Sequence, residues 1–380
     1  MSKMTTLTKT AKLFSRIVKS VAPPPKITVS EWADMYRKLS PENSAEPGQW
    51  RTDRAPYQRE IMDAVTDPQV EKIVVMTSSQ VGKSEILNNI IGYYIDVDPA
   101  PILLIQPTIE IAQDYSKRRI TPMVKDTEVL SGKVADSKTR DLNNTILMKV
   151  FPGGFLAMGG ANSPAGLASR PIRILLCDEV DRYPSSAGGE GDPISLAEKR
   201  TITFWNRKKI FTSTPTIRGA SRIEAEYEFG TREKYCVRCP KCGNYHFIVL
   251  RDIRFTHRCE EIAGKKTYIV EDIRWRCPDC GGEFDEYTMK RQPAEWIAEN
   301  PAAIVNGIRS FHLNSFVSPW HSWKEIIKEF LESKNDPERF KVFVNTILGE
   351  SWEERGDIED ETVLMSRREK YEAEVPDGVL

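Results

Sequence analysis

Residues 77–84 read Thr-Ser-Ser-Gln-Val-Gly-Lys-Ser, and this stretch decides the fold class of the 380-residue chain. The apolar run 73–76 predicts a strand before it, and the apolar spacing in 86–91 predicts a helix after it. Where a strand meets a helix in this way, backbone N–H groups and the helix N-terminus face an anion. The sequence therefore predicts a phosphate-binding loop with the nucleotide contacts Thr77, Ser78, Ser79, Gln80, Val81, Gly82, Lys83 and Ser84.

Within this loop the residue types match particular tasks. Lys83 would reach the outer phosphates and stabilise charge during hydrolysis, and the Ser84 hydroxyl would bind Mg²⁺. Gly82 lets the backbone approach the ligand closely. The usual pattern opens with glycine, whereas Thr77 occupies that position here.

A second apolar run, 172–177, predicts a buried strand that delivers Asp178 and Glu179 at its C-terminal end. Ligands of open α/β sheets bind at that edge. Asp178 would hold Mg²⁺ together with Ser84, and Glu179 would polarise the attacking water. An Asp-Glu pair also occurs in surface turns, but the buried strand and the upstream loop favour catalysis.

Two further strands are predicted at 102–108 and 207–216, so the core is expected to be α/β, with a mainly parallel sheet flanked by helices. Ser213 and Thr214 end the latter strand, where they would sense the γ-phosphate, although Ser or Thr before Pro is also a turn signal. Gln58 precedes the core and would read an adenine edge, unless it is an ordinary helix-surface residue. Arg170, in a loop rich in Gly, Ala and Ser, would act as an arginine finger, in cis or from a neighbouring subunit, or would pair with a surface carboxylate.

Charge and hydropathy exclude several classes of protein. Lys and Arg number 54 against 55 Asp and Glu, so contact with nucleic acid must come from local patches. One candidate is Lys117, Arg118 and Arg119, although such a run is more often a solvated helix end. Without an 18-residue apolar run or a signal peptide, the chain is expected to be soluble and intracellular, with no membrane partner.

Four cysteines predict a zinc site. Cys239-Pro-Lys-Cys242 and Cys277-Pro-Asp-Cys280 are each followed by glycine, and two such turns present four thiolates to a tetrahedral Zn²⁺. A hairpin pairing 247–250 with a strand near 268–270 is expected between them. Cys236 and Cys259 complicate this assignment, because Cys236 stands at knuckle spacing from Cys239. The alternative is a set of free thiols on a β insertion.

The order of these segments resembles the large terminase subunit of lambda-like tailed phages. The likeness is carried by the two cysteine knuckles and by residues 30–34, 56–59, 78–84, 178–182, 212–215 and 343–352. It implies an ATPase that pulls double-stranded DNA into a procapsid at the portal, in the cytoplasm of a host bacterium. It also implies a small terminase subunit as partner and a homo-oligomeric ring on assembly.

The resemblance sets the expected domains. They are a basic N-terminal arm (1–27), a P-loop ATPase core (28–230), a zinc-ribbon insertion (231–300), the completion of the ATPase domain (301–350) and a linker (351–380). The arm would dock on the small subunit, or would be a solvated or nucleic-acid-binding helix. The chain ends where the family's nuclease would begin, so neither a nuclease domain nor endonuclease activity is expected.

Two other functions compete with the packaging motor. A helicase uses the same chemistry but needs two motor lobes, and only one set of motifs is present. A zinc-ribbon DNA-binding protein could bind a nucleotide for a structural purpose only, and in that case Glu179 would have no catalytic role.

Overall fold

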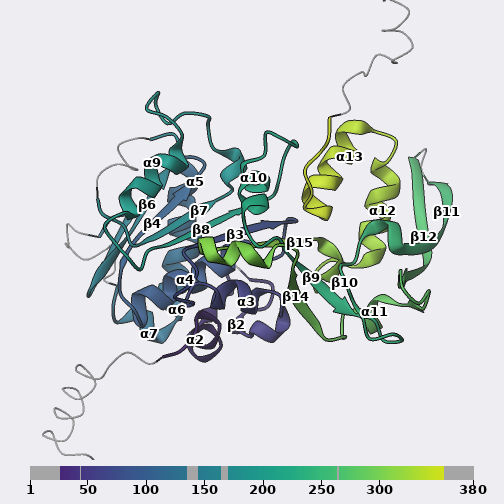
Figure 1. Ribbon diagram of the computed structural model, residues 1–380, viewed down its shortest axis with the longest axis horizontal. Helices are drawn as coiled ribbons and strands as arrows, with labels where there is room; N and C mark the ends of the chain where they lie inside the picture. Colours follow the sequence, from purple (N-terminus) through teal and green to yellow (C-terminus); the bar gives the residue numbers. More distant parts are fainter. Residues whose placement is uncertain (1–25, 43, 135–143, 164–169, 263–264, 355–380) are drawn as a thin grey trace, which may run out of the picture.

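A ten-stranded sheet organises the left-hand and central parts of the computed structural model in Figure 1. The structure describes residues 26–42, 44–134, 144–163, 170–262 and 265–354. The helix expected in the N-terminal arm, most of the linker and residues 164–169 of the loop before Arg170 lie outside these residues.

Six adjacent strands of this sheet are parallel, which confirms the predicted core. In spatial order they are β15 (Ile308–Leu313), β3 (Lys72–Thr77), β8 (Lys208–Ser213), β7 (Ile174–Asp178), β4 (Pro101–Gln106) and β6 (Gly154–Gly160). At one end β5 (Met148–Phe151) forms an antiparallel hairpin with β6. At the other end, β9 (Glu233–Arg238) runs parallel to β15 and is flanked by the antiparallel strands β10 (Tyr245–His246) and β14 (Ala294–Ala298).

Helices cover both faces of the sheet, so its strands read as continuous apolar runs. Ile73 and Val75 of β3 pack into one hydrophobic cluster, and Val74 and Met76 pack into another on the opposite face. The first face carries α2 (Val29–Tyr36), α3 (Gln58–Asp63), α4 (Lys83–Asp96), α6 (Thr121–Asp126) and α7 (Glu128–Ser131). The second face carries α9 (Pro193–Glu198) and α10 (Arg222–Phe229).

The N-terminal helix α2 is fixed to the helix that follows the phosphate loop. Trp32 is fully buried against Gly92 of α4, where an added Cβ would lie 2.1 Å from the indole. Its Nε1 also donates to Asp96 at 2.8 Å. A small two-stranded sheet, β1 (Lys38–Leu39) and β2 (Gly48–Gln49), and the turn η1 (Thr52–Arg54) complete this side.

The connections around the sheet are short helical segments. α5 (Ile109–Tyr115) continues into a π-helical turn, η2 (Ser116–Ile120). Further short turns are η3 (Val180–Arg182), η4 (Lys199–Thr201), η5 (Leu250–Asp252), η6 (Pro301–Asn306) and η7 (Ser315–Val317). None of the helices in the described part of the chain is long and apolar enough to cross a membrane.

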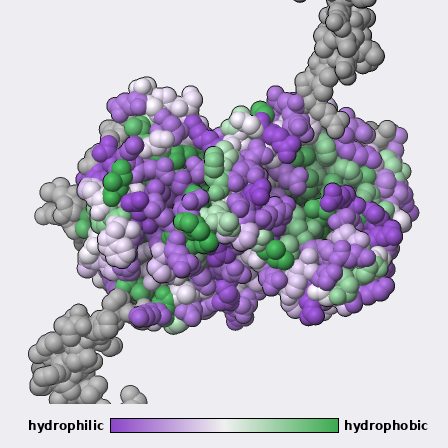
Figure 2. All heavy atoms as spheres, viewed as in Figure 1, coloured by the Kyte–Doolittle hydropathy of each residue, from purple (hydrophilic) through white to green (hydrophobic). Residues whose placement is uncertain are grey.

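The right-hand part of Figure 1 has its own hydrophobic cluster, which includes Trp275, Trp323 and Phe343. It contains β11 (Ile253–Ile262), β12 (Lys265–Arg276), β13 (Glu283–Phe284), α11 (Glu286–Met289), α12 (Trp323–Ser333), α13 (Pro337–Phe343) and the π-helical turn η8 (Val344–Leu348). On the face shown in Figure 2, hydrophobic residues gather over this part, whereas hydrophilic residues cover most of the remainder.

One expectation about this region needs correction. The hairpin is present, but its first strand is β11, with His257 opposite Val270, and residues 247–250 are not part of it. Ile248 is buried instead, and its carbonyl accepts from Asn314 Nδ2 at 2.7 Å, so these apolar residues serve the core. The segment expected as an insertion begins and ends with β9 and β14, which pair in the main sheet, and its assignment as a separate zinc-ribbon domain stays a prediction.

Candidate nucleotide site and metal centre

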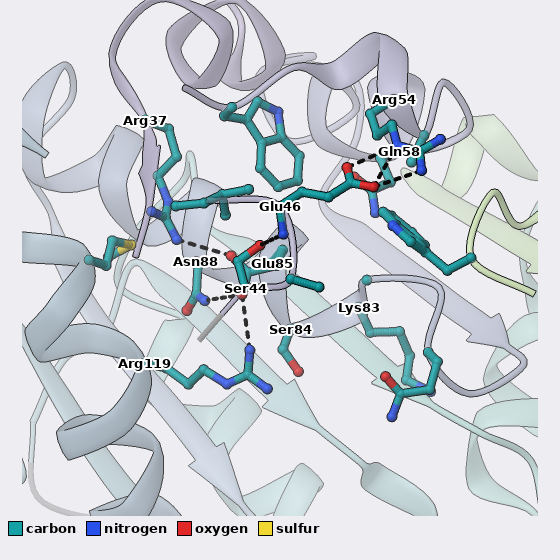
Figure 3. Close-up of a pocket in the computed structure, with 18 of the residues that line it drawn as sticks. Arg37, Ser44, Glu46, Arg54, Gln58, Lys83, Ser84, Glu85, Asn88 and Arg119 are labelled. Carbon is teal, nitrogen blue, oxygen red and sulfur yellow. Dashed lines mark hydrogen bonds and ion pairs between the residues drawn. The ribbon is translucent and has the colours of Figure 1, made fainter. Parts of the chain in front are cut away.

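A cavity of about 890 Å³ lies beside the loop 77–84, at the C-terminal edge of the parallel strands. Figure 3 shows Lys83 and Ser84 on one side of it and Arg37, Glu85 and Arg119 on another. The predicted site residues that line it are Gln58, Ser79, Gln80, Gly82, Lys83, Ser84, Glu179 and Thr214. Its size is within the range of small-molecule sites.

The loop backbone has the form that phosphate binding needs. Gln80 and Gly82 adopt positive φ, at 59° and 90°, and α4 starts at Lys83 without a side-chain cap, which leaves its first N–H groups for a ligand. Gln58, at the start of α3, supports the loop by donating a hydrogen bond from Nε2 to the Val81 carbonyl at 2.9 Å. A Cβ on Gly82 would lie 2.2 Å from that Nε2 and would displace the Gln58 side chain, and the φ of 90° also favours glycine.

Asp178 is held in one orientation by two neighbouring strands. Its carboxylate accepts from the Thr212 hydroxyl at 2.7 Å and from Gln106 Nε2 at 3.1 Å. Burial, and next the charge of Glu179, raises the pKa of Asp178. A buried, oriented carboxylate is the kind of oxygen ligand that a hard cation such as Mg²⁺ prefers.

Glu179 and Lys83 meet at the edge of the cavity. Glu179 Oε1 lies 3.6 Å from Lys83 Nζ, and the Thr214 hydroxyl donates to Glu179 Oε2 at 3.4 Å. Glu179 has a φ of 53°, a conformation that costs energy in a residue with a Cβ and is often found at functional sites. Burial lowers the pKa of Lys83, and the nearby carboxylates oppose this shift.

Six predicted residues do not line the cavity, namely Thr77, Ser78, Val81, Asp178, Ser213 and Arg170. Ser213 is fully buried, and its hydroxyl donates to the Thr214 carbonyl at 2.9 Å. Arg170 is exposed, and its side chain lies against the β5–β6 hairpin, with one guanidinium nitrogen 3.7 Å from Met148 Sδ and Cζ 5.5 Å from the ring centre of Phe155. The sensing role of Ser213 and the finger role of Arg170 therefore stay predictions.

Sequence reasoning missed several residues of the site. Thr212 and Gln106 orient Asp178, and Arg182 lines the cavity with Nε 3.8 Å from Glu179 Oε2. The signal for Thr212 was its position at a strand end beside the acidic pair, where a hydroxyl can reach a carboxylate.

Two arginines of the basic run 117–119 lie in different environments, one on the surface and one at the cavity. Arg118 pairs with Asp114 at 2.7 Å on the surface, whereas Arg119 lines the cavity and binds Glu85 at 3.1 Å. Glu85 also binds Arg37 at 3.0 Å (Figure 3). The π-helical turn η2 carries the run, and such turns are frequent at functional sites. Arg119 is therefore placed at the cavity and not on an outer DNA patch.

Comparison with known proteins identifies the family. A sequence model of the ATPase domain of the phage terminase large subunit gpA matches residues 44–296, more than half of the chain. The chain belongs to the phage terminase large subunit gpA family. The terminase large subunits of Enterobacteria phage P21 and Escherichia phage lambda are each 28% identical to it, over 94% and 95% of this chain respectively. The chain spans 58% of the length of both relatives.

Solved terminase structures are similar at low identity. The large terminase ATPase domain of Thermus phage P74-26 gives a TM-score of 0.43 at 16% identity, over 79% of this chain and 96% of that one. The HK97 bacteriophage large terminase gives 0.42 at 14% identity, over 53% and 41%.

The expectation that no nuclease sequence is present was wrong in part. A model of the gpA endonuclease domain matches residues 308–380 of this terminase-family chain. The match begins at β15, which pairs with β3 in the middle of the ATPase sheet. Sequence motifs did not reveal that one strand belongs to both parts. In space β15 completes the ATPase sheet, whereas in sequence it opens the range that matches the endonuclease model.

The four predicted zinc ligands come together. Cys239, Cys242, Cys277 and Cys280 have sulfurs within 4.8 Å of one another, and the pairs 239–280 and 242–277 are each 3.8 Å apart. Sulfurs bound tetrahedrally at ~2.3 Å from Zn²⁺ would be about 3.8 Å apart, so the cluster fits this ion.

The two knuckles are built alike. In each, the glycine after the second cysteine has positive φ and donates to the carbonyl of the first cysteine at 3.0 Å, as Gly243 does to Cys239 and Gly281 to Cys277. His246 Nε2 lies 3.5 Å from Cys277 Sγ and 3.3 Å from Asp279, where it can hold a thiolate in place. The other three cysteines, Cys177, Cys236 and Cys259, are outside this cluster.

Proposed function

We propose that this chain is the ATP-hydrolysing motor part of a phage terminase large subunit, which drives double-stranded DNA into a procapsid. One observation carries the proposal: Lys83 Nζ and Glu179 Oε1 lie 3.6 Å apart at the edge of a cavity large enough for a nucleotide. Asp178, the residue before Glu179, is held in one orientation by Thr212. Family membership supports ATP as the substrate.

The charge of the cavity favours a polyanion. Six cationic side chains line it, against the three carboxylates Glu46, Glu85 and Glu179; the cations are Arg37, Arg51, Arg54, Lys83, Arg119 and Arg182. An excess of positive charge in a concave site attracts phosphates and strengthens their binding. This balance favours a nucleoside triphosphate over a neutral ligand.

Each residue of the site has a proposed task in hydrolysis. Lys83 and the loop N–H groups bind the phosphates and stabilise the charge that develops as the terminal phosphoryl group leaves. Glu179 orients and polarises the attacking water, with Thr214 holding its carboxylate. Ser84 and Asp178 would bind Mg²⁺, which neutralises phosphate charge.

Arg170 is proposed to act from a neighbouring subunit. Within its own chain its side chain lies against Phe155, away from the cavity, so a ring of subunits would be needed to bring it to a nucleotide. Among the cavity arginines of the same chain, Arg182 lies beside the proposed base, with Nε 3.8 Å from Glu179 Oε2.

The partners follow from the family and stay proposals. They are double-stranded DNA, the small terminase subunit through residues 1–27, and the portal of the procapsid, all in the host bacterial cytoplasm. Zn²⁺ on the four cysteines would have a structural task. Of the competing functions, a helicase is disfavoured because the sequence has a single set of motor motifs. A zinc-ribbon DNA-binding protein is disfavoured because it would give Glu179 no catalytic role.

Replacement of the proposed base tests the function. Glu179→Gln should lower ATP hydrolysis at least ~100-fold while ATP binding persists, because the neutral amide cannot activate water. Glu190→Gln, in an exposed loop, is the matched control and should behave like the unmodified chain. Hydrolysis at the unmodified rate in Glu179→Gln would refute the ATPase mechanism.

A further inference from the structure

We propose that residues 344–352, here called the clasp, position the phosphate loop and transmit nucleotide occupancy to the chain that follows. The clasp comprises the π-helical turn η8, Gly349 and the residues up to Trp352. The inference rests on the proposed function, because it assigns the clasp to the same nucleotide site.

One end of the clasp binds the first half of the phosphate loop. The Thr346 carbonyl accepts from the Ser79 N–H at 2.7 Å and from the Ser79 hydroxyl at 3.1 Å. The adjacent Ser78 N–H donates to the Leu313 carbonyl of β15 at 2.9 Å. These two loop N–H groups are thus engaged by protein, which leaves phosphate binding to the N–H groups from Gln80 onward. The clasp therefore fixes the part of the loop in which Thr77 replaces the usual glycine.

Gly349 makes this contact possible. It ends η8 with a φ of 65°, and an added Cβ would lie 2.6 Å from Ser78 N and 2.9 Å from the Leu313 carbonyl oxygen. The obstruction is backbone, which cannot move aside without displacing the loop. Any larger residue at this position should therefore shift the phosphate loop.

The other end of the clasp binds the loop that follows β8. Trp352 N–H donates to the Thr216 carbonyl at 2.8 Å, and the Arg218 N–H donates to the Trp352 carbonyl at 2.9 Å. The Thr216 hydroxyl in turn donates to Asp181 at 2.9 Å, two residues after Glu179. One short segment thus joins the phosphate loop to the loop after β8 and to the acidic turn.

This arrangement couples the two loops to the clasp. A change in their separation on nucleotide binding must move the clasp or strain its hydrogen bonds, and by linkage a displaced clasp must weaken nucleotide binding. The clasp lies inside the range 308–380 that matches the endonuclease-domain model. Nucleotide occupancy would thereby reach the part of the chain that resembles the nuclease.

Two measurements on the full chain test the proposal. Saturation with a non-hydrolysable ATP analogue and Mg²⁺ should slow amide hydrogen exchange in peptides covering 344–352 of the unmodified chain at least threefold. Gly349→Ala should weaken binding of a fluorescent ATP analogue about tenfold. The matched control is Gly189→Ala, where φ is 86° and an added Cβ meets nothing within 4 Å; its affinity should change less than twofold.

The outcomes separate this proposal from the function on which it rests. Unmodified chain that binds no ATP analogue would overturn the proposed function and the clasp with it. Binding by the unmodified chain, with equal affinity in Gly349→Ala, would overturn the clasp alone. Should Gly349→Ala fail to fold, the exchange measurement decides, and unchanged exchange at 344–352 under saturation refutes the coupling.

Discussion

The hydroxyl of Thr212 donates a 2.7 Å hydrogen bond to Oδ1 of Asp178, and the two residues are direct partners in the register of β8 and β7. The bond spans two parallel strands and lies within the buried edge of the sheet. It orients the carboxylate that we assign to Mg²⁺, and it opposes the rise that burial causes in the pKa of Asp178. Thr212 is thus a positioning residue for the metal.

Thr212→Val keeps the shape of the side chain and removes the donor. A buried acceptor that loses its partner costs about 1–3 kcal/mol. The pKa of Asp178 should rise further, so proton competition should increase the Mg²⁺ concentration for half-maximal hydrolysis roughly tenfold. Titration of ATPase activity with Mg²⁺ measures this, with Thr66→Val as a control outside the cavity. An unchanged Mg²⁺ requirement would remove Thr212 from the site.

Arg119 and Arg118 form a matched pair for testing the cavity. Arg119→Ala should weaken ATP binding roughly 5- to 20-fold, about 1–2 kcal/mol, because a charged donor is lost from the cavity wall. Arg118→Ala should leave affinity unchanged, because its side chain pairs with Asp114 on the surface. Equilibrium binding of a fluorescent ATP analogue without DNA separates the two. A larger loss in Arg118→Ala would contradict the assignment.

The cysteine cluster should hold one zinc ion per chain. Cys242→Ser should abolish stoichiometric zinc and lower the unfolding temperature by several degrees, since metal binding adds directly to folding free energy. Cys277→Ser should do the same, whereas Cys259→Ser, exposed and outside the cluster, should retain the ion. Elemental analysis of the purified variants gives the stoichiometry. Full zinc content in both knuckle variants would exclude this ligand set.

His312 should make stability depend on pH. Burial lowers its pKa to about 4, and its Nε2 has no hydrogen-bond partner among the described residues. In the unfolded chain the pKa is near ~6.5. Between about pH 6.5 and pH 4 the histidine is protonated in the unfolded state and neutral in the folded state. The full contribution of His312 to the free energy of unfolding is therefore present above about pH 6.5. It falls by about 3 kcal/mol as the pH drops toward 4.

The His312 contribution is measured as a difference between variants. Urea unfolding of the unmodified chain and of His312→Phe at several pH values between 7 and 4 gives two stability curves. The variant should lose less stability on acidification, because it lacks the group that titrates. Parallel curves would show that His312 does not titrate differently in the two states.

Local patterns were sufficient for the core of this fold and for the centre of its site. Residues 73–76 lie in β3 and residues 174–177 of the run 172–177 lie in β7, and both strands are buried on both faces, so their apolar character indicated sheet strands directly. The loop 77–84 and the pair Asp178 and Glu179 follow those strands, and parallel strands bring their C-terminal ends together.

The remaining site residues depend on contacts that a local pattern does not contain. The bond between Ser79 and Thr346 joins residues 267 positions apart. Arg119 faces inward through a π-helical turn that basic spacing alone does not reveal. Residues 247–250 look like a strand because they are apolar, but Ile248 is needed for core packing against the end of β15.

Binding of ATP to Lys83→Met tests the central claim most directly, because Lys83 is the cation that joins the phosphate loop to Glu179. Methionine keeps the length and apolar stem of the buried side chain and removes only its charge. In the presence of Mg²⁺, we expect the unmodified chain to bind ATP and Lys83→Met to bind at least ~100-fold more weakly at unchanged unfolding temperature. Equal ATP affinity in the two proteins would contradict the assignment of this cavity as a nucleotide site.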